Sequence, residues 1–237
     1  MKPIVVVDPP RADAAAVVEL GRLGVATVFE AGGRTGLLGT GLRPAWVGAA
    51  AAGTAVTVLC PPGDNLMVHV AIEQVGQGDL LVITTTSPCG DGYVGELIAT
   101  ALVARGAAGL VTTTGIRDVA AITKAGFPVW SQSVSAQGTV RATAGSVNVP
   151  IVIGNTVVSP GDVVIADDDG VVAVPRLRAT EVVESARARE AKEELSRAAF
   201  AGGELSLDRY DLRPQLDRLG VRYVRAYDLD GQSGGES

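Results

Sequence analysis

The sequence predicts an α/β fold with a mixed sheet and a helical arm at its C-terminal end. Residues 79–113 read as a strand, a helix and a second strand, the pattern of a parallel βαβ unit. Residues 129–174 hold short Val-rich strands between turns, which favours antiparallel pairing. Residues 177–201 form a charged, Ala-rich amphipathic pattern, which indicates a helix. The expected organisation is a single domain over residues 1–176, a helical arm over 177–230 and a disordered tail over 231–237.

Composition narrows the class of protein. The 237-residue chain is 47% hydrophobic but only 4% aromatic, so its core must be built from Ala, Val, Leu and Ile. Its 30 glycines indicate many turns and closely packed backbone. The net charge of −6 argues against sequence-independent nucleic-acid binding, because such binding needs Lys and Arg to neutralise phosphates.

The N-terminal residues and the cysteines bear on location. The first apolar run is soon broken by Asp8 and Pro9, so it is too short for a signal peptide or a membrane span. Cys60 and Cys89 form no CxxC pattern and do not indicate a disulfide-built fold. We therefore expect a cytoplasmic protein without a membrane partner.

The first part of the chain predicts two helices and a strand. Residues 11–24 carry apolar side chains at helical spacing and end in glycine. Residues 54–59 alternate and are β-branched, as a strand requires, and residues 65–74 read as a helix. The glycine-rich stretch 32–41 lacks the GK[ST] ending of a P-loop, so we interpret it as a flexible loop, with a phosphate cradle as the alternative.

The one histidine of the chain, His69, lies in the second of these helices among apolar neighbours. A histidine in such a context is more often part of the core or of a helix face than catalytic, and we interpret it so. With a single histidine, a multi-histidine zinc site and a His-based triad are both poorly supported.

The middle of the chain is the most informative part. Residues 79–84 and 108–113 predict strands, and residues 95–105 predict a helix that Gly106 closes. Because crossover connections between parallel strands are right-handed, the helix start and the turn after the second strand should lie at the same edge of the sheet.

Beyond residue 128 the pattern changes to short strands and turns. Pro160 and Gly161 occupy the second and third positions of a predicted turn, where type II turns prefer proline and glycine. The run at 167–170, three aspartates and a glycine, invites a metal interpretation as well as a turn. No EF-hand pattern surrounds it, so a hairpin turn is the preferred prediction.

A turn over residues 115–118, which contains Arg117 and Asp118, is predicted after the second strand of the βαβ unit, at the edge where ligands of α/β sheets collect. A guanidinium suits a carboxylate, and an adjacent aspartate can hold a hard cation such as Mg²⁺ or Mn²⁺. The alternative is a surface turn in which Asp118 caps the next helix.

The start of the helix at 95–105 favours the interpretation of Arg117 and Asp118 as binding residues over that of a surface turn. Its free amides, from Leu97 and Ile98 onward, can bind the oxygens of an anion, and they face the same edge as Arg117. Between them a substrate carboxylate could be held while a metal on Asp118 polarises an adjacent keto oxygen. Glu96 could position water for proton transfer, or it could simply stabilise the helix N-terminus.

A resemblance to a known family rests on longer segments that include these residues. They occur in one order over roughly residues 24–224, as GTAVTVLCPPGDN, DGYVGELIAT, ARGAAGLV, GIRDV, GFPVWSQSVSAQGT, GSVNVPIV, VSPGDVVIADDDGVV and LSLDRYDLRPQL. With these segments the chain resembles the 4-hydroxy-4-methyl-2-oxoglutarate / 4-carboxy-4-hydroxy-2-oxoadipate aldolases. These are class II pyruvate aldolases related to the regulator of ribonuclease activity A.

The resemblance implies roles for individual residues. Asp118 matches the metal-binding aspartate of the family, and Arg117 matches its pyruvate-binding arginine. Leu97 and Ile98 match the residues whose backbone amides hold the pyruvate carboxylate. Glu96 matches an acidic residue that orients catalytic water, although close relatives carry Asp there.

Two further positions follow from the same resemblance. Glu193 matches a glutamate of the C-terminal helix that reaches the site of a neighbouring subunit, with Glu190 and Glu194 as alternatives. Thr113 stands in a TTTG run where close relatives carry an aspartate, a departure that bears on metal affinity or substrate choice.

The implied fold is a swivelling β/β/α catalytic domain that assembles as a homotrimer or homohexamer, with sites at subunit interfaces and the arm packed on a neighbour. The implied reaction is divalent-metal-dependent cleavage of a branched 4-hydroxy-2-oxo acid to release pyruvate, in the degradation of aromatic compounds. Oxaloacetate decarboxylation is the expected side activity. No lysine Schiff base is expected, because none of the three lysines lies in a buried apolar strand.

Two other functions remain as alternatives. The first is a non-catalytic, protein-binding regulator of ribonuclease activity, which shares the core and acts by contact. The second is a methyltransferase, a label that this superfamily has carried. It is disfavoured because the sequence shows no glycine-rich cofactor loop in a Rossmann context.

Overall fold

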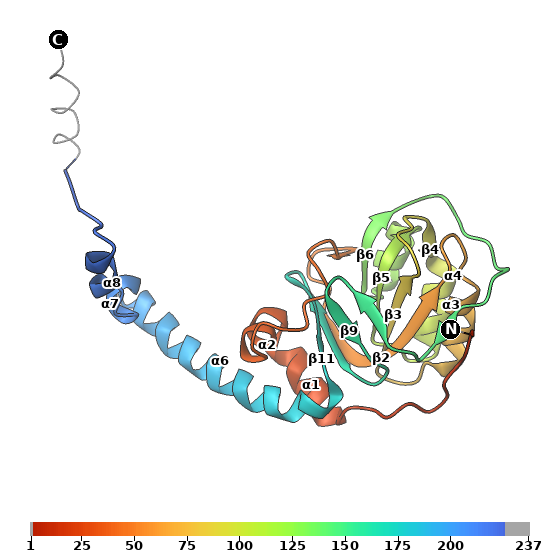
Figure 1. The fold of residues 1–237 in the computed structure, drawn as a ribbon, viewed down its shortest axis with the longest axis horizontal. Helices are drawn as coiled ribbons and strands as arrows, with labels where there is room; N and C mark the ends of the chain where they lie inside the picture. The colour runs from red at the N-terminus through yellow and green to blue at the C-terminus, as the bar shows by residue number, and fades with distance from the viewer. Residues whose placement is uncertain (1, 226–237) are drawn as a thin grey trace, which may run out of the picture. The chain divides into compact units, whose positions relative to one another are not determined.

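The computed structural model describes residues 2–225, and the chain divides into two compact units, residues 1–190 and 191–237. The first unit is built on one large sheet. The helices α1 (Ala14–Leu23) and α2 (Val25–Ala31) pack on one part of this sheet, and α3 (Leu66–Gln74) and α4 (Glu96–Ala104) pack on another part of the same face (Figure 1). The predicted α/β class with a mixed sheet is confirmed.

The sheet has nine strands in the order β1-β6-β5-β3-β2-β10-β11, with β4 paired to β5 and β7 paired to β2. The neighbours β2–β3, β3–β5 and β5–β6 are parallel, whereas β10 pairs antiparallel with both β2 and β11. The strand bounds are β1 (Arg43–Pro44), β2 (Ala51–Cys60), β3 (Asp79–Thr85), β4 (Gly92–Val94), β5 (Gly109–Ile116), β6 (Val129–Val134), β7 (Ser146–Val147), β10 (Val163–Asp167) and β11 (Gly170–Val174).

The remaining elements lie outside this sheet. A separate two-stranded hairpin is formed by β8 and β9. The bounds are β8 (Ile151–Ile153), β9 (Thr156–Val158), α5 (Val119–Ala125), a 3₁₀ turn (Arg176–Arg178), α6 (Ala179–Ala201), α7 (Ser206–Arg209) and α8 (Arg213–Arg218). No helix within residues 2–225 is long and apolar enough to cross a membrane.

The first predicted helix is confirmed as α1, and a second helix follows it that the sequence did not predict. The side chain of Asp13 caps α1 by accepting from the amide of Ala16 at 2.9 Å, and Gly24, with φ of +78°, ends it. The amide of Val25 then donates to the carboxylate of Asp167 at 2.8 Å. This cap comes from the distant β10–β11 hairpin, so α2 depends on tertiary structure that local sequence patterns do not reveal.

Both predicted turns in the second half of the chain are confirmed. The amide of Asp162 donates to the carbonyl of Ser159 at 3.1 Å, with Gly161 at a φ of +85°. The aspartates at 167–169 form the turn between β10 and β11. Both carboxylate oxygens of Asp168 accept from the amide of Gly48, at 2.9 and 3.0 Å, so this run stabilises loops.

The core is aliphatic, as the composition predicts, and it lies in three clusters of buried side chains around the sheet. Trp130 is the largest fully buried side chain, and its indole N–H donates to the carbonyl of Asp167 at 2.9 Å. Val182, Val183 and Ala186 of α6 are buried in the cluster that α1 and α2 share. The start of α6 therefore belongs to the first unit.

The N-terminal segment is attached to the sheet by charge. The carboxylate of Asp79, at the start of β3, is fully buried and forms an ion pair with Arg11, whose second guanidinium nitrogen lies 2.9 Å from Oδ2. The amide of Gly76 donates to the same oxygen at 2.7 Å. The hydrogen bond to Asp79 raises the pKa of Arg11 more than burial lowers it.

The second unit contains the rest of α6 together with α7 and α8. Phe200 and Tyr210 meet edge to face with ring centroids 5.8 Å apart, and Asp208 pairs with Arg213. The prediction that residues 177–230 act as an arm on a neighbouring subunit stays a prediction. The tail predicted at 231–237 lies outside the described residues.

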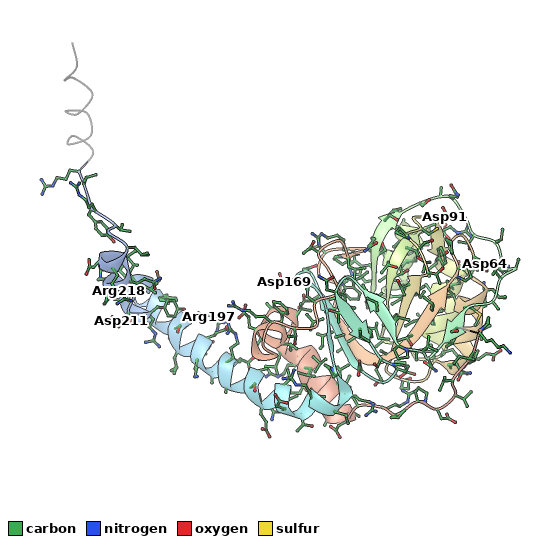
Figure 2. All side chains as sticks on the ribbon, viewed as in Figure 1. Asp64, Asp91, Asp169, Arg197, Asp211 and Arg218 are labelled. Carbon is green, nitrogen blue, oxygen red and sulfur yellow. The ribbon has the colours of Figure 1, made fainter. Side chains whose placement is uncertain are left out.

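The loop between β6 and β7 is held by one buried carboxylate, Asp64, which Figure 2 labels. Its Oδ2 accepts from the amides of Ala142 and Thr143, each at 2.7 Å, and its Oδ1 accepts from the amide of Leu66 at 2.9 Å. Burial alone would raise the pKa of Asp64, but these backbone hydrogen bonds outweigh it and leave the pKa below its usual value.

We expect Asp64→Asn to lower the free energy of unfolding at pH 7 by about 2–3 kcal/mol, since the amide nitrogen cannot accept these hydrogen bonds. Because the folded pKa is depressed, the stabilisation from Asp64 is complete above about pH 4 and is lost as pH falls further. Urea unfolding from about pH 7 to about pH 2 should therefore show the two proteins converging in acid. The exposed control Asp169→Asn should change little, and a constant gap between wild type and Asp64→Asn at all pH values would contradict the assignment.

Candidate active site

The site is assembled where β4 joins the end of β5. The short strand β4 pairs in parallel with Gly115 and Ile116, and the amide of Arg117 donates to the carbonyl of Val94 at 2.9 Å. Since α4 begins directly after β4, its first turn lies beside the residues that follow β5. The neighbourhood expected from the right-handed crossover is present. The turn expected at Gly115 and Ile116 instead belongs to β5, because β4 extends the pairing.

Asp118 is the residue that joins the two segments. Its Oδ2 accepts from the amide of Glu96 at 3.2 Å, so the carboxylate lies at the N-terminus of α4. A Cβ on Gly95 would fall 2.5 Å from this oxygen, so the carboxylate needs glycine at that position. Asp118 itself has φ of +56° and ψ of +33°, a left-handed conformation that is uncommon for a residue other than glycine.

Asp118 also occupies the N-cap position of α5, the alternative considered from the sequence, but its side chain does not cap that helix. The carboxylate instead accepts a hydrogen bond from the first amide of α4. Oδ1 has no hydrogen-bond partner within residues 2–225, and the side chain is 48% exposed, so one carboxylate oxygen is open to a ligand.

Arg117 lies beside this carboxylate. Its Nε is 3.8 Å from Oδ2 of Asp118, and its side chain is 47% exposed. A Cβ on Gly138 would lie 3.0 Å from one terminal nitrogen of the guanidinium, so the loop after β6 passes close against it. This loop is itself held to β4 by the amide of Gly92, which donates to the carbonyl of Gln137 at 2.7 Å.

These residues border a cavity of about 180 Å³, which is smaller than the roughly 300–1,000 Å³ of drug-sized ligand sites and so limits the occupant to a small molecule. Its lining includes polar or charged side chains from three regions of the chain, namely Asn65 and His69 of the α3 segment, Arg117 and Asp118 after β5, and Thr139 and Arg141 of the loop.

Leu97 and Ile98 also line the cavity, and their amides are the free donors expected at a helix start. The amide of Glu96 is taken by Asp118 and that of Ala99 by the carbonyl of Gly95, at 3.1 Å. No hydrogen bond from the amides of Leu97 or Ile98 is present within the described chain. The structure thus brings Arg117, Asp118 and two unpaired amides together at one cavity.

Glu96 points elsewhere. Its Oε1 accepts from Thr100 Oγ1 at 3.0 Å, and it borders an open groove with Asp118 and Lys124 on the outer side of the site. Its role with water stays a prediction.

Thr113 lies away from the cavity, on β5. Its hydroxyl lies 2.9 Å from that of Thr84, and it lines a different hollow at the ends of β3 and β6.

The three candidate glutamates lie on α6. Glu190, in the first unit, pairs with Arg22 at 2.7 Å, and Glu194, in the second, pairs with Arg197. Glu193 also belongs to the second unit. The proposed reach of Glu193 into a neighbouring subunit stays a prediction.

His69, interpreted from the sequence as a core or helix-face residue, is partly buried and lines the cavity. Burial lowers the pKa of His69, and the positive charge of Arg141 lowers it further, which favours a neutral imidazole. Asn65, Tyr93 and Arg141 were not singled out by the sequence analysis. The one available signal was the four-residue spacing of Asn65 and His69, which places them on one face of a helix.

Comparison with known proteins identifies the family. A model of the RraA-like family, described as Aldolase/RraA, matches residues 12–173. The chain belongs to the RraA-like family.

Relatives of this RraA-like chain carry different names. A Halalkalibacterium halodurans protein provisionally named 4-hydroxy-4-methyl-2-oxoglutarate aldolase is 29% identical over 158 residues, which cover 67% of this chain and 75% of that protein. The crystal structure of Streptomyces coelicolor RraAS2, described as an unusual member of the RNase ES inhibitor RraA protein family, is 30% identical with a TM-score of 0.72. It covers 80% of this chain and 99% of its own.

A third similar structure has yet another name. It is described as S-adenosylmethionine: 2-dimethylmenaquinone methyltransferase from Geobacillus kaustophilus, with 26% identity and a TM-score of 0.55, over 60% of this chain and 86% of its own. Proteins of this fold therefore carry names for different activities, so the function of this chain must be argued from the residues of its site.

The conformation of Asp118 predicts an unusual order of stability. Glycine adopts this φ without strain, whereas Ala does not, so Asp118→Gly should be more stable than Asp118→Ala by about 1–2 kcal/mol in urea unfolding. At Asp91, which has no positive φ, the same two substitutions should not show this order. Equal stability of the two Asp118 variants would argue against the left-handed conformation.

Proposed function

We propose that this RraA-like chain is a divalent-metal-dependent aldolase that cleaves 4-hydroxy-4-methyl-2-oxoglutarate or 4-carboxy-4-hydroxy-2-oxoadipate. The products are pyruvate together with a second pyruvate or oxaloacetate. The observation that carries the proposal is the convergence of the Asp118 carboxylate, the Arg117 guanidinium and the unpaired amides of Leu97 and Ile98 at one cavity. The name of the Halalkalibacterium halodurans relative supports it.

The donor set fits a hard cation of limited protein coordination. No cluster of three or more His, Cys, Asp or Glu side chains suited to a metal exists within residues 2–225. Mg²⁺ and Mn²⁺ bind through oxygen, and Mg²⁺ commonly keeps several waters and takes only one or two carboxylates from the protein. Asp118 offers one such oxygen, with space beside it for water and for a substrate oxygen. A cation held there would supply Lewis acidity to the 2-keto group.

The residues of the chain divide the work of binding a 2-oxo acid. The amides of Leu97 and Ile98 bind the substrate carboxylate at the positive end of α4. Arg117 stabilises the negative charge that develops on the keto oxygen as the C3–C4 bond breaks, because its guanidinium lies at the cavity beside Asp118. The same charge develops when oxaloacetate loses CO₂, so oxaloacetate decarboxylation is the proposed side activity.

Two proton transfers accompany the cleavage: a base takes the proton of the C4 hydroxyl as the C3–C4 bond breaks, and the pyruvate enolate gains a proton at C3. Glu96 would orient the water that returns a proton to C3, which requires its carboxylate to leave Thr100. Glu193 would contribute from a neighbouring subunit of a homotrimer or homohexamer, and the proposed setting is the cytoplasm. Because Glu96 is held by a single exposed hydrogen bond, the cost of this rotation is small.

A second candidate function is a protein-binding regulator of ribonuclease activity. The likeness to RraAS2, which extends over 99% of that chain, is the observation that favours it. The two candidates separate in one assay, because a regulator acting by contact has no need to release pyruvate or to depend on a divalent cation.

We expect pyruvate release from 4-hydroxy-4-methyl-2-oxoglutarate with Mg²⁺ or Mn²⁺ and its loss in EDTA. Arg117→Lys should lower kcat/KM by about 100-fold or more, since lysine keeps the charge but loses the planar pair of donors. A coupled lactate dehydrogenase assay measures both. Full activity in EDTA, together with borohydride trapping of pyruvate on a lysine, would contradict the mechanism.

Gly95→Ala tests the geometry without removing any functional side chain. The added methyl group would displace the Asp118 carboxylate and crowd Arg117, while the backbone of Gly95 is extended and accepts alanine. We expect an intact fold by circular dichroism and a loss of pyruvate release of about 100-fold. Gly41→Ala, where the added methyl group has space, is the matched control. Activity near the wild-type level in Gly95→Ala would show that the carboxylate is not needed in this place.

A further inference from the structure

Two buried polar atoms at the cavity lack partners, and the proposed chemistry of Arg117 and Asp118 does not use them. Asn65 is only 5% exposed, and its Oδ1 has no hydrogen-bond partner within residues 2–225. The Nε2 of His69 is buried in the same way and also lacks a partner in that range. Both residues line the cavity. Buried polar groups without partners are rare in folded proteins and call for an explanation, such as a ligand.

The orientation of the Asn65 amide is fixed by the protein. Its Nδ2 donates to the carbonyl of Tyr93 at 2.9 Å. Rotating the amide by half a turn would place Oδ1 against that carbonyl oxygen, and two acceptors repel. The atom left over is therefore an acceptor, and a hydrogen-bond donor of a ligand can satisfy it.

The two unpaired atoms can contact one ligand group. Asn65 is the N-cap of α3 and His69 lies in the first turns of that helix, and both residues line one cavity. A hydroxyl group fits this pair because it donates and accepts at once. It can donate to Asn65 while forming a second hydrogen bond with the imidazole of His69. An ionised carboxylate cannot fit, because it has no hydrogen to donate to Asn65.

A positive charge lies at the same end of the cavity. Arg141 lines the cavity and is close enough to His69 to act on its pKa. A ligand that places a hydroxyl between Asn65 and His69 can therefore place a carboxylate against Arg141. Arg117, which binds the oxo acid in the proposed function, remains available for the other end of the ligand.

We propose that Asn65, His69 and Arg141 form a specificity subsite for a carbon that carries both a hydroxyl and a carboxylate. This inference rests on the proposed function and deepens it, because it assigns the residues that recognise C4 of the substrate. Asn65 and His69 hold the C4 hydroxyl, and Arg141 holds the carboxylate attached to C4. Substrates with both groups on C4 are therefore preferred over those with a C4 hydroxyl alone.

The first test compares two reactions of one protein. The cleavage reaction requires a C4 hydroxyl, whereas oxaloacetate decarboxylation has none. We expect His69→Phe to lower kcat/KM for 4-hydroxy-4-methyl-2-oxoglutarate by about tenfold or more and to leave oxaloacetate decarboxylation within about twofold. His69→Gln, which keeps a polar atom, should recover part of the loss, and Ile72→Val is the control for a change in cavity shape. Equal losses in both reactions would overturn the subsite.

The second test does not require catalysis. Malate carries a hydroxyl and a carboxylate on one carbon, and succinate is the same molecule without the hydroxyl. In EDTA, where no cation can bind the hydroxyl, we expect the wild type to bind malate about fivefold more tightly than succinate by calorimetry, the factor of one hydrogen bond. In His69→Phe and Asn65→Leu the ratio should fall to about one.

Arg141→Gln should weaken both acids alike, and Arg34→Gln, which removes an exposed charge elsewhere, should weaken neither. A wild type without preference for malate, or a preference that survives both substitutions, would overturn the subsite. If the wild type releases no pyruvate but shows the malate preference, the proposed function fails and the subsite stands.

Discussion

The pairing of one carboxylate with the first amide of one helix is the constraint on which the site depends. Asp118 follows β5, Glu96 begins α4, and the 3.2 Å contact between them exists because β3 and β5 are parallel and joined by a right-handed crossover. Shifting either strand by one residue would turn the carboxylate away from the helix. This contact requires a strained left-handed backbone at Asp118 and the absence of a side chain at Gly95. Both residues lie where a ligand would bind.

Local patterns were sufficient to predict the parts of the fold that are local. The βαβ unit and the position of Arg117 and Asp118 followed from strand and helix periodicity, and the hairpin at Asp167 followed from its turn residues. The helix α2 was missed because its cap, Asp167, lies 142 residues away. The turn at Gly115 was misplaced for another reason: β4, whose pairing extends β5 there, has only three residues and an irregular register.

The residues of the cavity also divide into those that local sequence patterns could bring together and those that only the folded chain brings together. Arg117, Asp118, Leu97 and Ile98 belong to one βαβ unit, so sequence spacing could bring them together. Asn65, His69 and Arg141 come from a preceding helix and a later loop, which meet because Asp64 binds the amides of Ala142 and Thr143. A histidine among apolar neighbours gives no sign that a loop from the other half of the chain will leave its Nε2 facing a cavity.

The buried carboxylate of Asp79 gives Arg11, and with it the segment that precedes α1, a structural role. Arg11 neutralises that charge at the start of β3, a central strand that precedes β4 and α4 in the chain. A protease that cut between Arg11 and α1 would leave an uncompensated anion in the interior. Cleavage of this N-terminal segment would therefore destabilise a central strand of the sheet.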